Sequence, residues 1–253
     1  MDPLNASKTV VVIPAYNEAK TIVDVALRVL AQQLTLIVVD DASEDGTSEC
    51  LADMGVTVLR NEQNLGKGGS LWRGMQFALE LGADVVITLD GDGQHRPEDI
   101  PLVLNAADAY PETIIIAARK LNNEQAPKAR KAANNIADFW ISWAAGYPIS
   151  DSQSGFRLYP AKLIRSVSIN TSTERGFVFE SEILIKAVAS DIFSHAVAIP
   201  SIYEKGARPS HFRPVRDIVN ITLMVAAHLI RHGLAPLRLL RSLRLLPQPR
   251  IGR

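Results

Sequence analysis

Short apolar runs alternate with longer stretches of helical periodicity along the first half of the chain. Runs rich in Val, Ile and Thr, which predict buried strands, occupy residues 9–13, 35–39, 56–59, 85–89 and 113–117. Between these runs, apolar residues recur at the spacing of a helix in residues 19–32, 47–54, 65–81 and 99–109. Buried strands that alternate with helices are typical of right-handed crossovers and of a doubly wound, mostly parallel sheet. We therefore predict an α/β fold.

The second half of the chain departs from this regular order. After a polar loop at 121–127, we predict helices over 128–145, 161–167 and 177–189, and strands over 155–159 and 196–202. The first of these helices carries Phe139, Trp140 and Trp143, and we expect this cluster to be buried because aromatic residues at helical spacing usually belong to a core. We predict one domain over residues 1–217 and a helical tail over 218–253.

Polar side chains follow the apolar runs where the predicted strands end. They are Tyr16, Asn17 and Glu18 after the first strand, Asp40 and Asp41 after the second, Asp90 and Asp92 after the fourth, and Arg119 after the fifth. In an open parallel sheet, ligands bind outside the carboxyl ends of the strands. Each group alone also fits a helix cap, and Asp40 or Asp41 could cap the helix predicted near Thr47. Their convergence on one edge of the sheet favours a binding site.

The run at 85–89 ends in a segment that presents two carboxylates and an amide. Asp90, Asp92 and Gln94 supply hard oxygen ligands of the kind that Mg²⁺ or Mn²⁺ prefers, and they leave coordination positions for phosphate oxygens. Gly91 and Gly93 have no side chains, so a bulky ligand can approach the main chain there. The competing interpretation of this segment on its own is a solvated acidic turn.

The glycine pattern argues against other nucleotide-binding classes. A nicotinamide-binding dehydrogenase needs a glycine-rich turn after its first strand, and residues 14–18 contain no glycine. Residues 66–69 read Gly-Lys-Gly-Gly, but the last glycine of a G-x-G-x-x-G motif would fall on Leu71. Walker A spacing occurs nowhere in the chain.

The composition of the chain limits the cellular compartments in which we expect it. With 253 residues, of which 47% are hydrophobic, the chain can bury a large core. Cys50 is the single cysteine, so an internal disulfide is excluded, and the first residues lack the apolar core of a signal peptide. No apolar run reaches the length that spans a bilayer. We predict a cytoplasmic chain and expect no nucleic-acid partner.

The net charge of zero hides an uneven distribution. After Asp217 the chain has six arginines and no Asp, Glu or Lys. In a helix that begins at Pro236, one face would carry Leu239, Leu240, Leu243 and Leu246, and the opposite face Arg238, Arg241 and Arg244. Such a basic amphipathic helix can lie on the surface of an anionic membrane. The alternative is that its apolar face packs on the chain's own domain or on a second copy of the chain.

Six segments, in register along the chain, resemble the motifs of a known family. They read VIPAYNE at 12–18, VVDDASEDGT at 38–47, NLGKG at 64–68, DGDGQHRPE at 90–98, DSQSGFR at 151–157 and GFVFESE at 176–182. The first four resemble the successive motifs of family 2 glycosyltransferases. The last two narrow the resemblance to the branch of dolichyl-phosphate mannose and glucose synthases, and the match extends from about residue 9 to residue 210.

The resemblance implies a GT-A fold, a nucleoside diphosphate sugar as the donor and inversion at the anomeric carbon. By motif position it assigns the nucleoside to Pro14, Tyr16, Glu18, Val39 and Asp41. It assigns the divalent cation, Mg²⁺ or Mn²⁺, and the diphosphate to Asp90, Gly91, Asp92 and Gln94. Arg119 and Arg208 would contact phosphates of the donor or the acceptor. Lys67 would also lie in the donor site, unless it is only a solvated residue at a helix start.

Together these motifs predict transfer of a hexose from a GDP or UDP sugar to a polyprenyl phosphate, such as dolichyl or undecaprenyl phosphate. A phosphate acceptor is already ionised at neutral pH, so we expect positioning and charge stabilisation, by residues such as Asp92, Arg119 and Arg208, to carry catalysis. The alternative is an acceptor with a hydroxyl group, which needs a general base, and the candidates are Asp151 and Glu180.

A third alternative is a nucleotide-sugar-binding module without activity. It is disfavoured because both carboxylates of the expected metal site are present. A lipid-linked acceptor would place the enzyme on the cytoplasmic face of a membrane, with the basic tail as the attachment.

Overall fold

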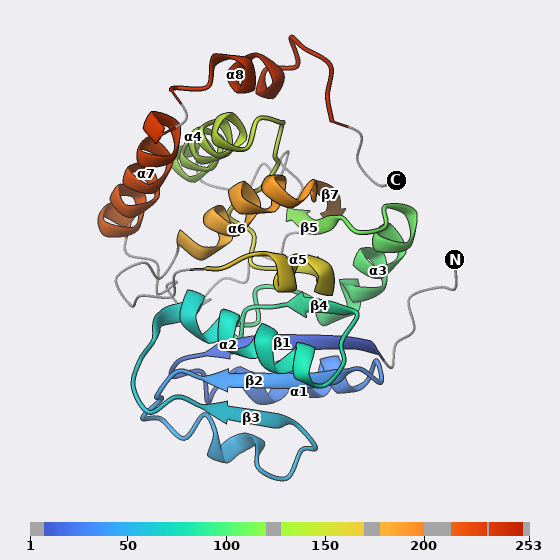
Figure 1. The fold of residues 1–253 in the computed structure, drawn as a ribbon. Coiled ribbons are helices and arrows are strands. Elements are labelled where there is room, and N and C mark those ends of the chain that lie inside the picture. The colour runs from blue at the N-terminus through green and yellow to red at the C-terminus, as the bar shows by residue number, and fades with distance from the viewer. Residues whose placement is uncertain (1–7, 120–127, 170–177, 200–213, 232, 250–253) are drawn as a thin grey trace.

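The computed structural model describes residues 8–119, 128–169, 178–199, 214–231 and 233–249, without the side chains of 119, 128–133 and 214–220. Within these residues, seven strands form one sheet in the order β3-β2-β1-β4-β6-β5-β7 (Figure 1). The strands are β1 (Thr9–Ala15), β2 (Thr35–Asp40), β3 (Thr57–Arg60), β4 (Val85–Thr88), β5 (Ile114–Arg119), β6 (Arg157–Pro160) and β7 (Ser194–Ile199). The predicted α/β class with a mostly parallel sheet is confirmed.

Strand β6 runs against both of its neighbours. Strands β1 to β4 pair in parallel, as do β5 and β7, whereas β6 lies antiparallel between β4 and β5. Arg157 at the start of β6 lies opposite Thr88 at the end of β4. The residues that precede β6 therefore reach the edge of the sheet where the parallel strands end.

Helices cover both faces of the sheet, as expected for a doubly wound fold (Figure 1). They are α1 (Ile22–Leu30), α2 (Gly66–Glu80), α3 (Ile100–Ala109), α4 (Lys128–Ala145), α5 (Ala161–Ser166), α6 (Phe179–Ala187), α7 (Pro214–Arg231) and α8 (Pro236–Ser242), with short 3-10 helices η2 (Glu49–Leu51), η3 (Pro97–Asp99) and η5 (Val188–Ser190). Val10 and Val12 of β1 join a core with α2, α4 and α6, whereas Val11 and Ile13 join a core with α1 and α3. A strand buried on both faces needs apolar side chains throughout, which explains the continuous Val and Ile run.

Helix α2 lies against the sheet at Gly74. A Cβ atom at this position would be 2.5 Å from Val12 Cγ1 and 2.9 Å from Val39 Cγ2. Only a residue without a side chain permits this approach. The contact fixes α2 on β1 and β2, and it thereby positions Lys67 in the first turn of the helix.

Most predicted elements are present with boundaries shifted by a few residues, but one differs more. The helix predicted over 47–54 is reduced to the single turn η2, because the Thr47 and Ser48 hydroxyls donate hydrogen bonds to Asp45 and Asp40 in the preceding loop. The strand predicted over 196–202 begins earlier, at Ser194, because β7 pairs with the whole length of β5. Residues 200–202 lie outside the described residues.

The C-terminal helices pack on α4. The Trp143 indole N–H donates to the Leu234 carbonyl at 3.0 Å, and the Arg238 guanidinium donates to the Ala144 carbonyl at 3.0 Å. Arg238 therefore faces the domain instead of an outer polar surface, and α8 ends at Ser242, before the second half of the predicted amphipathic stretch. The predicted arginine face is therefore wrong for Arg238, and the helix is shorter than predicted.

The expectation that the aromatic cluster of α4 is buried is also wrong for two of its three members. Phe139 and Trp140 are 40% and 41% exposed, and only Trp143 is half-buried, because it lies under the chain that leads into α8. Among the described residues, no helix combines the length and the hydrophobicity needed to cross a bilayer.

Candidate active site

The polar segments that were predicted to converge meet at one edge of the sheet. The arrows of β2 and β3 in Figure 1 point to the edge where α2 begins, which is the carboxyl edge of the parallel strands. There the Thr21 hydroxyl donates to the Gly91 carbonyl at 2.7 Å, which joins the loop after β1 to the loop after β4. The candidate site is therefore built from loops that are held together by direct hydrogen bonds.

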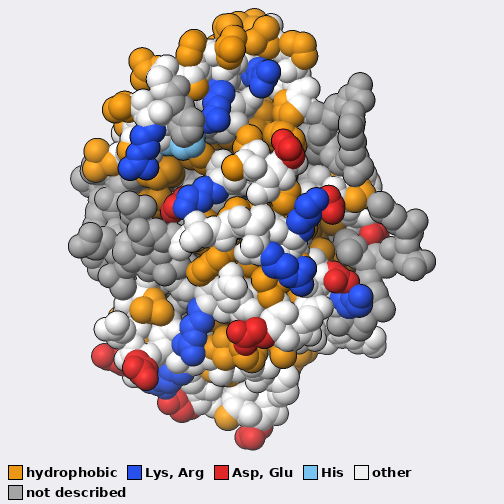
Figure 2. All heavy atoms as spheres, in the orientation of Figure 1, with side chains coloured by type: hydrophobic (Ala, Val, Ile, Leu, Met, Phe, Trp, Pro, Cys, Tyr) orange, Lys and Arg blue, Asp and Glu red, His pale blue; other side chains and the backbone are white. Residues whose placement is uncertain are grey.

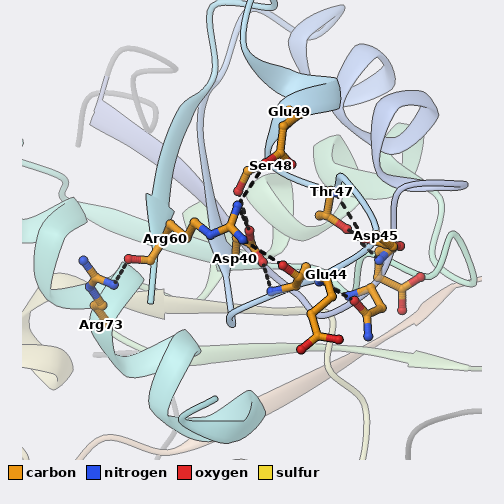
Figure 3. Close-up of polar contacts among 11 residues, drawn as sticks. Asp40, Glu44, Asp45, Thr47, Ser48, Glu49, Arg60 and Arg73 are labelled. Atoms are coloured by element: carbon orange, nitrogen blue, oxygen red, sulfur yellow. Dashed lines mark hydrogen bonds and ion pairs between the residues drawn. The ribbon is translucent and has the colours of Figure 1, made fainter. Parts of the chain in front are cut away.

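Asp40 organises the loop that follows β2 (Figure 3). Its Oδ1 accepts a hydrogen bond from the Ser43 N–H at 2.9 Å, and its Oδ2 accepts one from the Ser48 hydroxyl and lies 3.7 Å from Arg60. The side chain is fully buried. Asp40 thus holds the turn after β2. The alternative that it caps a helix near Thr47 is not confirmed, because only the short 3-10 helix η2 forms there and it has no side-chain cap hydrogen bond.

The same loop supports the segment after β1. The Asn17 N–H donates to Ser43 Oγ at 2.9 Å, and the Glu18 N–H donates to Thr47 Oγ1 at 2.9 Å. The buried Glu18 carboxylate accepts a hydrogen bond from the Thr21 hydroxyl at 3.1 Å. The two segments that the motifs assign to the nucleoside therefore form one unit.

The five residues assigned to the nucleoside differ in what they present. Tyr16 is 38% exposed directly after β1, and Pro14 is half-buried at the end of that strand. Asp41 is buried, and its Oδ1 accepts hydrogen bonds from Asn61 Nδ2 and from the main-chain N–H that precedes α2, each at 2.7 Å. The Val39 side chain is fully buried in the core, so any nucleoside contact of this residue is restricted to its main chain.

Asp90, just beyond the end of β4, lies between two basic side chains. Lys67 Nζ is 2.6 Å from Asp90 Oδ1 and 2.9 Å from Glu180 Oε1, and Glu180 belongs to the first turn of α6. His95 Nε2 lies 3.6 Å from Asp90 Oδ2. The Lys67 side chain is only 19% exposed, so the interpretation of this residue as a solvated helix start is wrong. Three segments far apart in the sequence meet in one charged cluster.

Burial and these charges set the protonation states in the cluster. Burial disfavours the ionised form of Asp90, but Lys67, and His95 after it, hold its pKa well below the usual range. Burial also disfavours the charged form of Lys67, but the carboxylates of Asp90 and Glu180 hold its pKa above the ordinary value. Burial first, and the charge of Asp90 second, raise the pKa of Asp92. The site therefore favours additional positive charge next to Asp92.

This arrangement fits a divalent cation that is shared with a substrate. Asp92 Oδ1 accepts the Gln94 N–H at 2.9 Å, and a Cβ atom at Gly93 would meet nothing within 4 Å, so the loop is open. The described residues contain no group of three His, Cys, Asp or Glu side chains gathered as a metal site. Mg²⁺ is usually held by one or two carboxylates together with substrate phosphates, which Asp90 and Asp92 match.

The segment before β6 closes one side of this cluster. Gly155 lies against Asp90, since a Cβ atom at position 155 would be 2.6 Å from Asp90 Oδ2. The guanidinium of the fully buried Arg157 donates to the main-chain carbonyls of Ser152 at 2.6 Å, Ser154 at 2.8 Å and Glu180 at 2.7 Å. Arg157 therefore ties the 151–156 segment to the start of α6.

Asp151, one of the two candidates for a general base, is buried and has a left-handed main chain with φ +50°. Its N–H and that of Ser152 donate to the Asp138 carboxylate on α4 at 2.9 and 2.8 Å. Burial raises the pKa of Asp138, against the effect of its hydrogen bonds with Ser152 and Asp151. Asp138 thus positions the turn that carries Asp151.

Sequence reasoning missed Asp138, since it is one of several polar residues on a predicted helix and belongs to no motif. The pairing of Lys67 with Glu180 was missed too, although both lie inside quoted motifs, which was the available signal. Arg119 ends β5, but its side chain and the whole of Arg208 lie outside the described residues.

The fold is that of GT-A glycosyltransferases. A crystal structure of glucosyl-3-phosphoglycerate synthase from Mycobacterium tuberculosis, with Mn²⁺, UDP and glucosyl-3-phosphoglycerate, matches it with a TM-score of 0.64 and 21% identity. The match covers 90% of this chain and 80% of the synthase chain. Residues 10–179 match the model of the family described as Glycosyl transferase family 2, and the chain belongs to this family.

Two named relatives are similar to this chain over most of their own length. UDP-N-acetylglucosamine–dolichyl-phosphate N-acetylglucosaminyltransferase from Methanococcus voltae is 30% identical over 76% of this chain and 84% of its own. Undecaprenyl-phosphate mannosyltransferase from Micrococcus luteus is 28% identical over 71% of this chain and 77% of its own. Both names specify a polyprenyl phosphate as the acceptor.

Proposed function

We propose that this chain transfers a hexose, with inversion, from a nucleoside diphosphate sugar to a polyprenyl phosphate, and that it uses a divalent cation. The observation that carries the proposal is the cluster of Asp90, Asp92 and Lys67 at the carboxyl edge of the sheet. The acceptor class is supported by the names of the two relatives, which act on dolichyl phosphate and undecaprenyl phosphate.

The order of the loops along the edge of the sheet supports an assignment for each part of the donor. Tyr16 and Glu18 lie on the unit formed with the loop after β2, which suits the nucleoside, and the hydrogen bond from Thr21 to Gly91 leads from there to the acidic segment. Asp90, Asp92 and Gln94 would hold the cation, which when bound stabilises the negative charge that a leaving nucleoside diphosphate gains. We assign Arg119 and Arg208 to phosphates of the donor or the acceptor.

The burial of both candidate bases supports an acceptor whose reacting group is already ionised. Glu180 is buried, and its carboxylate contacts Lys67, while Asp151 is 4% exposed in the turn held by Asp138. Neither carboxylate presents an exposed proton acceptor of the kind that a hydroxyl-bearing acceptor requires. A phosphate acceptor needs no such base, because positioning and charge stabilisation suffice.

A thermal-shift screen tests the donor half of the proposal. The purified chain is heated with nucleoside diphosphates and nucleotide sugars, with Mg²⁺, with Mn²⁺ and with excess chelator. We expect one nucleoside diphosphate series to raise the midpoint, and the rise to require the cation, because a ligand that binds only the folded chain stabilises it by mass action. A rise that is equal in chelator would contradict the metal part, and no rise with any nucleotide would contradict the donor assignment.

The end of the molecule formed by α4, α7 and α8 is proposed as the face that lies on the membrane. In Figure 2 hydrophobic side chains gather over this end, with Lys and Arg side chains beside them. The exposed apolar side chains of these helices and of the adjoining chain are Ile136, Phe139, Trp140, Leu223, Ile230, Leu234, Leu237, Leu240, Leu243 and Leu245. Exposed leucines and aromatics next to arginines are typical of a surface that enters the lipid interface.

Co-sedimentation with anionic vesicles tests this face. Replacement of the exposed Leu237, Leu240 and Leu243 by Ser is expected to weaken binding about tenfold or more, since each leucine would lose the transfer free energy of burial in lipid. The matched control replaces Leu27, Leu81 and Leu102 by Ser, because these leucines are equally exposed but lie on α1, at the end of α2 and on α3. Equal binding of the two triple variants, or no binding of the wild type at low salt, would remove the membrane face from the account.

A further inference from the structure

Lys67 lies where its charge competes with that of a divalent cation. Its ammonium is 2.6 Å from Asp90 Oδ1, a direct charge-assisted contact, and it is slightly farther, at 2.9 Å, from Glu180 Oε1. A cation bound to the same Asp90 oxygen would stand within about 4 Å of the ammonium, where two positive charges repel strongly. Lys67 and the cation therefore cannot both keep their best contact with Asp90.

Glu180 offers Lys67 a second position. Its side chain is 5% exposed in the first turn of α6, where its main-chain carbonyl is fixed by Arg157. Its Oε1 contacts Lys67, whereas its Oε2 is buried and has no hydrogen-bond partner among the described residues. A buried carboxylate oxygen without a partner is costly, so an arrangement that brings a donor to it is favoured. Lys67 carries three N–H donors and is already in contact with the neighbouring oxygen.

We propose that Lys67 is an exchangeable counter-ion of the metal site, which neutralises Asp90 in the metal-free enzyme and moves fully onto Glu180 when the cation binds. The inference rests on the proposed function in one respect, namely that the cation binds at Asp90. It differs from a role in which Lys67 only contacts donor phosphates, because such a residue would not affect the binding of the metal alone.

The exchange has a consequence for the order of binding. Lys67 opposes the entry of a bare cation, since the charge of Asp90 is already compensated. A nucleoside diphosphate brings negative charge that compensates both Lys67 and the cation. Metal and nucleotide are therefore expected to bind cooperatively, and each should tighten the binding of the other by the same factor.

Mn²⁺ binding in the absence of nucleotide measures the competition directly. The electron paramagnetic resonance signal of free Mn²⁺ is followed as wild type, Lys67→Met or Lys67→Gln is added, and circular dichroism checks that each variant is folded. Both variants are expected to bind Mn²⁺ about tenfold more tightly, because a close repelling charge is removed. The matched control is Lys162→Met. Lys162 lies on α5, directly after the end of β6 that is away from the candidate site, and its Nζ is paired with Glu112 Oε2 at 2.6 Å. This control should leave the affinity unchanged.

A double variant, Lys67→Met with Asp90→Asn, tests whether the tighter binding of Mn²⁺ takes place at Asp90. This variant should not show the increase in Mn²⁺ affinity. If both folded Lys67 variants bind Mn²⁺ no more tightly than the wild type, the exchange is overturned, even if the enzyme transfers sugar to a polyprenyl phosphate. If both bind it more tightly and the double variant does not, the exchange stands, even if the acceptor proves to be of another class. Failure of every form to bind Mn²⁺, with or without nucleotide, would overturn both this inference and the metal part of the proposed function.

Discussion

Replacement of Asp92 by Asn is expected to lower the rate of sugar transfer by about 10³-fold or more, since it removes one of the two carboxylates that we propose offset the charge of the cation. The fold should remain intact, because Asp92 is half-buried at a loop and an Asn Oδ1 can still accept the Gln94 N–H. The measurement is kcat/KM for transfer at saturating Mn²⁺, with thermal denaturation of the same preparation as the test of folding.

The matched control for this prediction is Asp53→Asn, which makes the same chemical change at an exposed position outside the candidate site. It should leave transfer and stability unchanged. Undiminished transfer by the Asp92 variant, or full activity of the wild type in excess chelator, would show that the acidic segment is only a turn.

Replacement of Arg157 by Met is expected to give a large loss of stability, about 3–5 kcal/mol in the free energy of unfolding. Arg157 is fully buried and donates hydrogen bonds to three main-chain carbonyls, those of Ser152, Ser154 and Glu180. Met fills much of the volume but leaves the carbonyls without a donor, and each buried unpaired group costs about 1–3 kcal/mol. Urea unfolding, followed by circular dichroism, measures the loss.

Arg28→Met is the comparison for Arg157. Arg28 forms ion pairs with Asp24 and Glu98 at the surface, where such pairs contribute about 1 kcal/mol or less. A cost for the Arg157 variant that is no larger than that of the Arg28 variant would mean that the carbonyls of the 151–156 segment find other partners. The role given to Arg157 in holding this segment beside Asp90 would then fall.

The first five strands could be predicted because each is a short run of β-branched and aliphatic residues, and such runs are clear in the sequence even for β3, which lies half-buried at the edge of the sheet. The direction of β6 could not be predicted, because residues 155–159 have the pattern of a strand whether they pair in parallel or antiparallel. The helix predicted over 47–54 failed for a different reason. There the hydroxyls of Thr47 and Ser48 bond to the carboxylates of the preceding loop, which competes with helix formation.

The candidate site was predictable in its parts but not in its connections. Motifs and strand ends pointed to Asp90 and Asp92, because carboxylates after a buried strand are seen directly in the sequence. The contact between Lys67 and Glu180 joins α2 to α6 across more than a hundred residues, and it depends on how both helices pack on the sheet. Of the aromatic residues on α4, Trp143 is half-buried because its indole N–H donates to the Leu234 carbonyl, whereas Phe139 and Trp140 are exposed, and helical spacing alone does not report this difference.

A transfer assay with matched acceptors tests whether the acceptor is a polyprenyl phosphate. The purified chain, Mn²⁺ and a radiolabelled nucleotide sugar of the series selected by the thermal-shift screen are incubated with undecaprenyl phosphate or with undecaprenol, which differs only in lacking the phosphate. We expect a labelled lipid from undecaprenyl phosphate alone, and none in excess chelator. Equal transfer to undecaprenol, or transfer to neither lipid while a soluble hydroxyl acceptor is labelled, would contradict it.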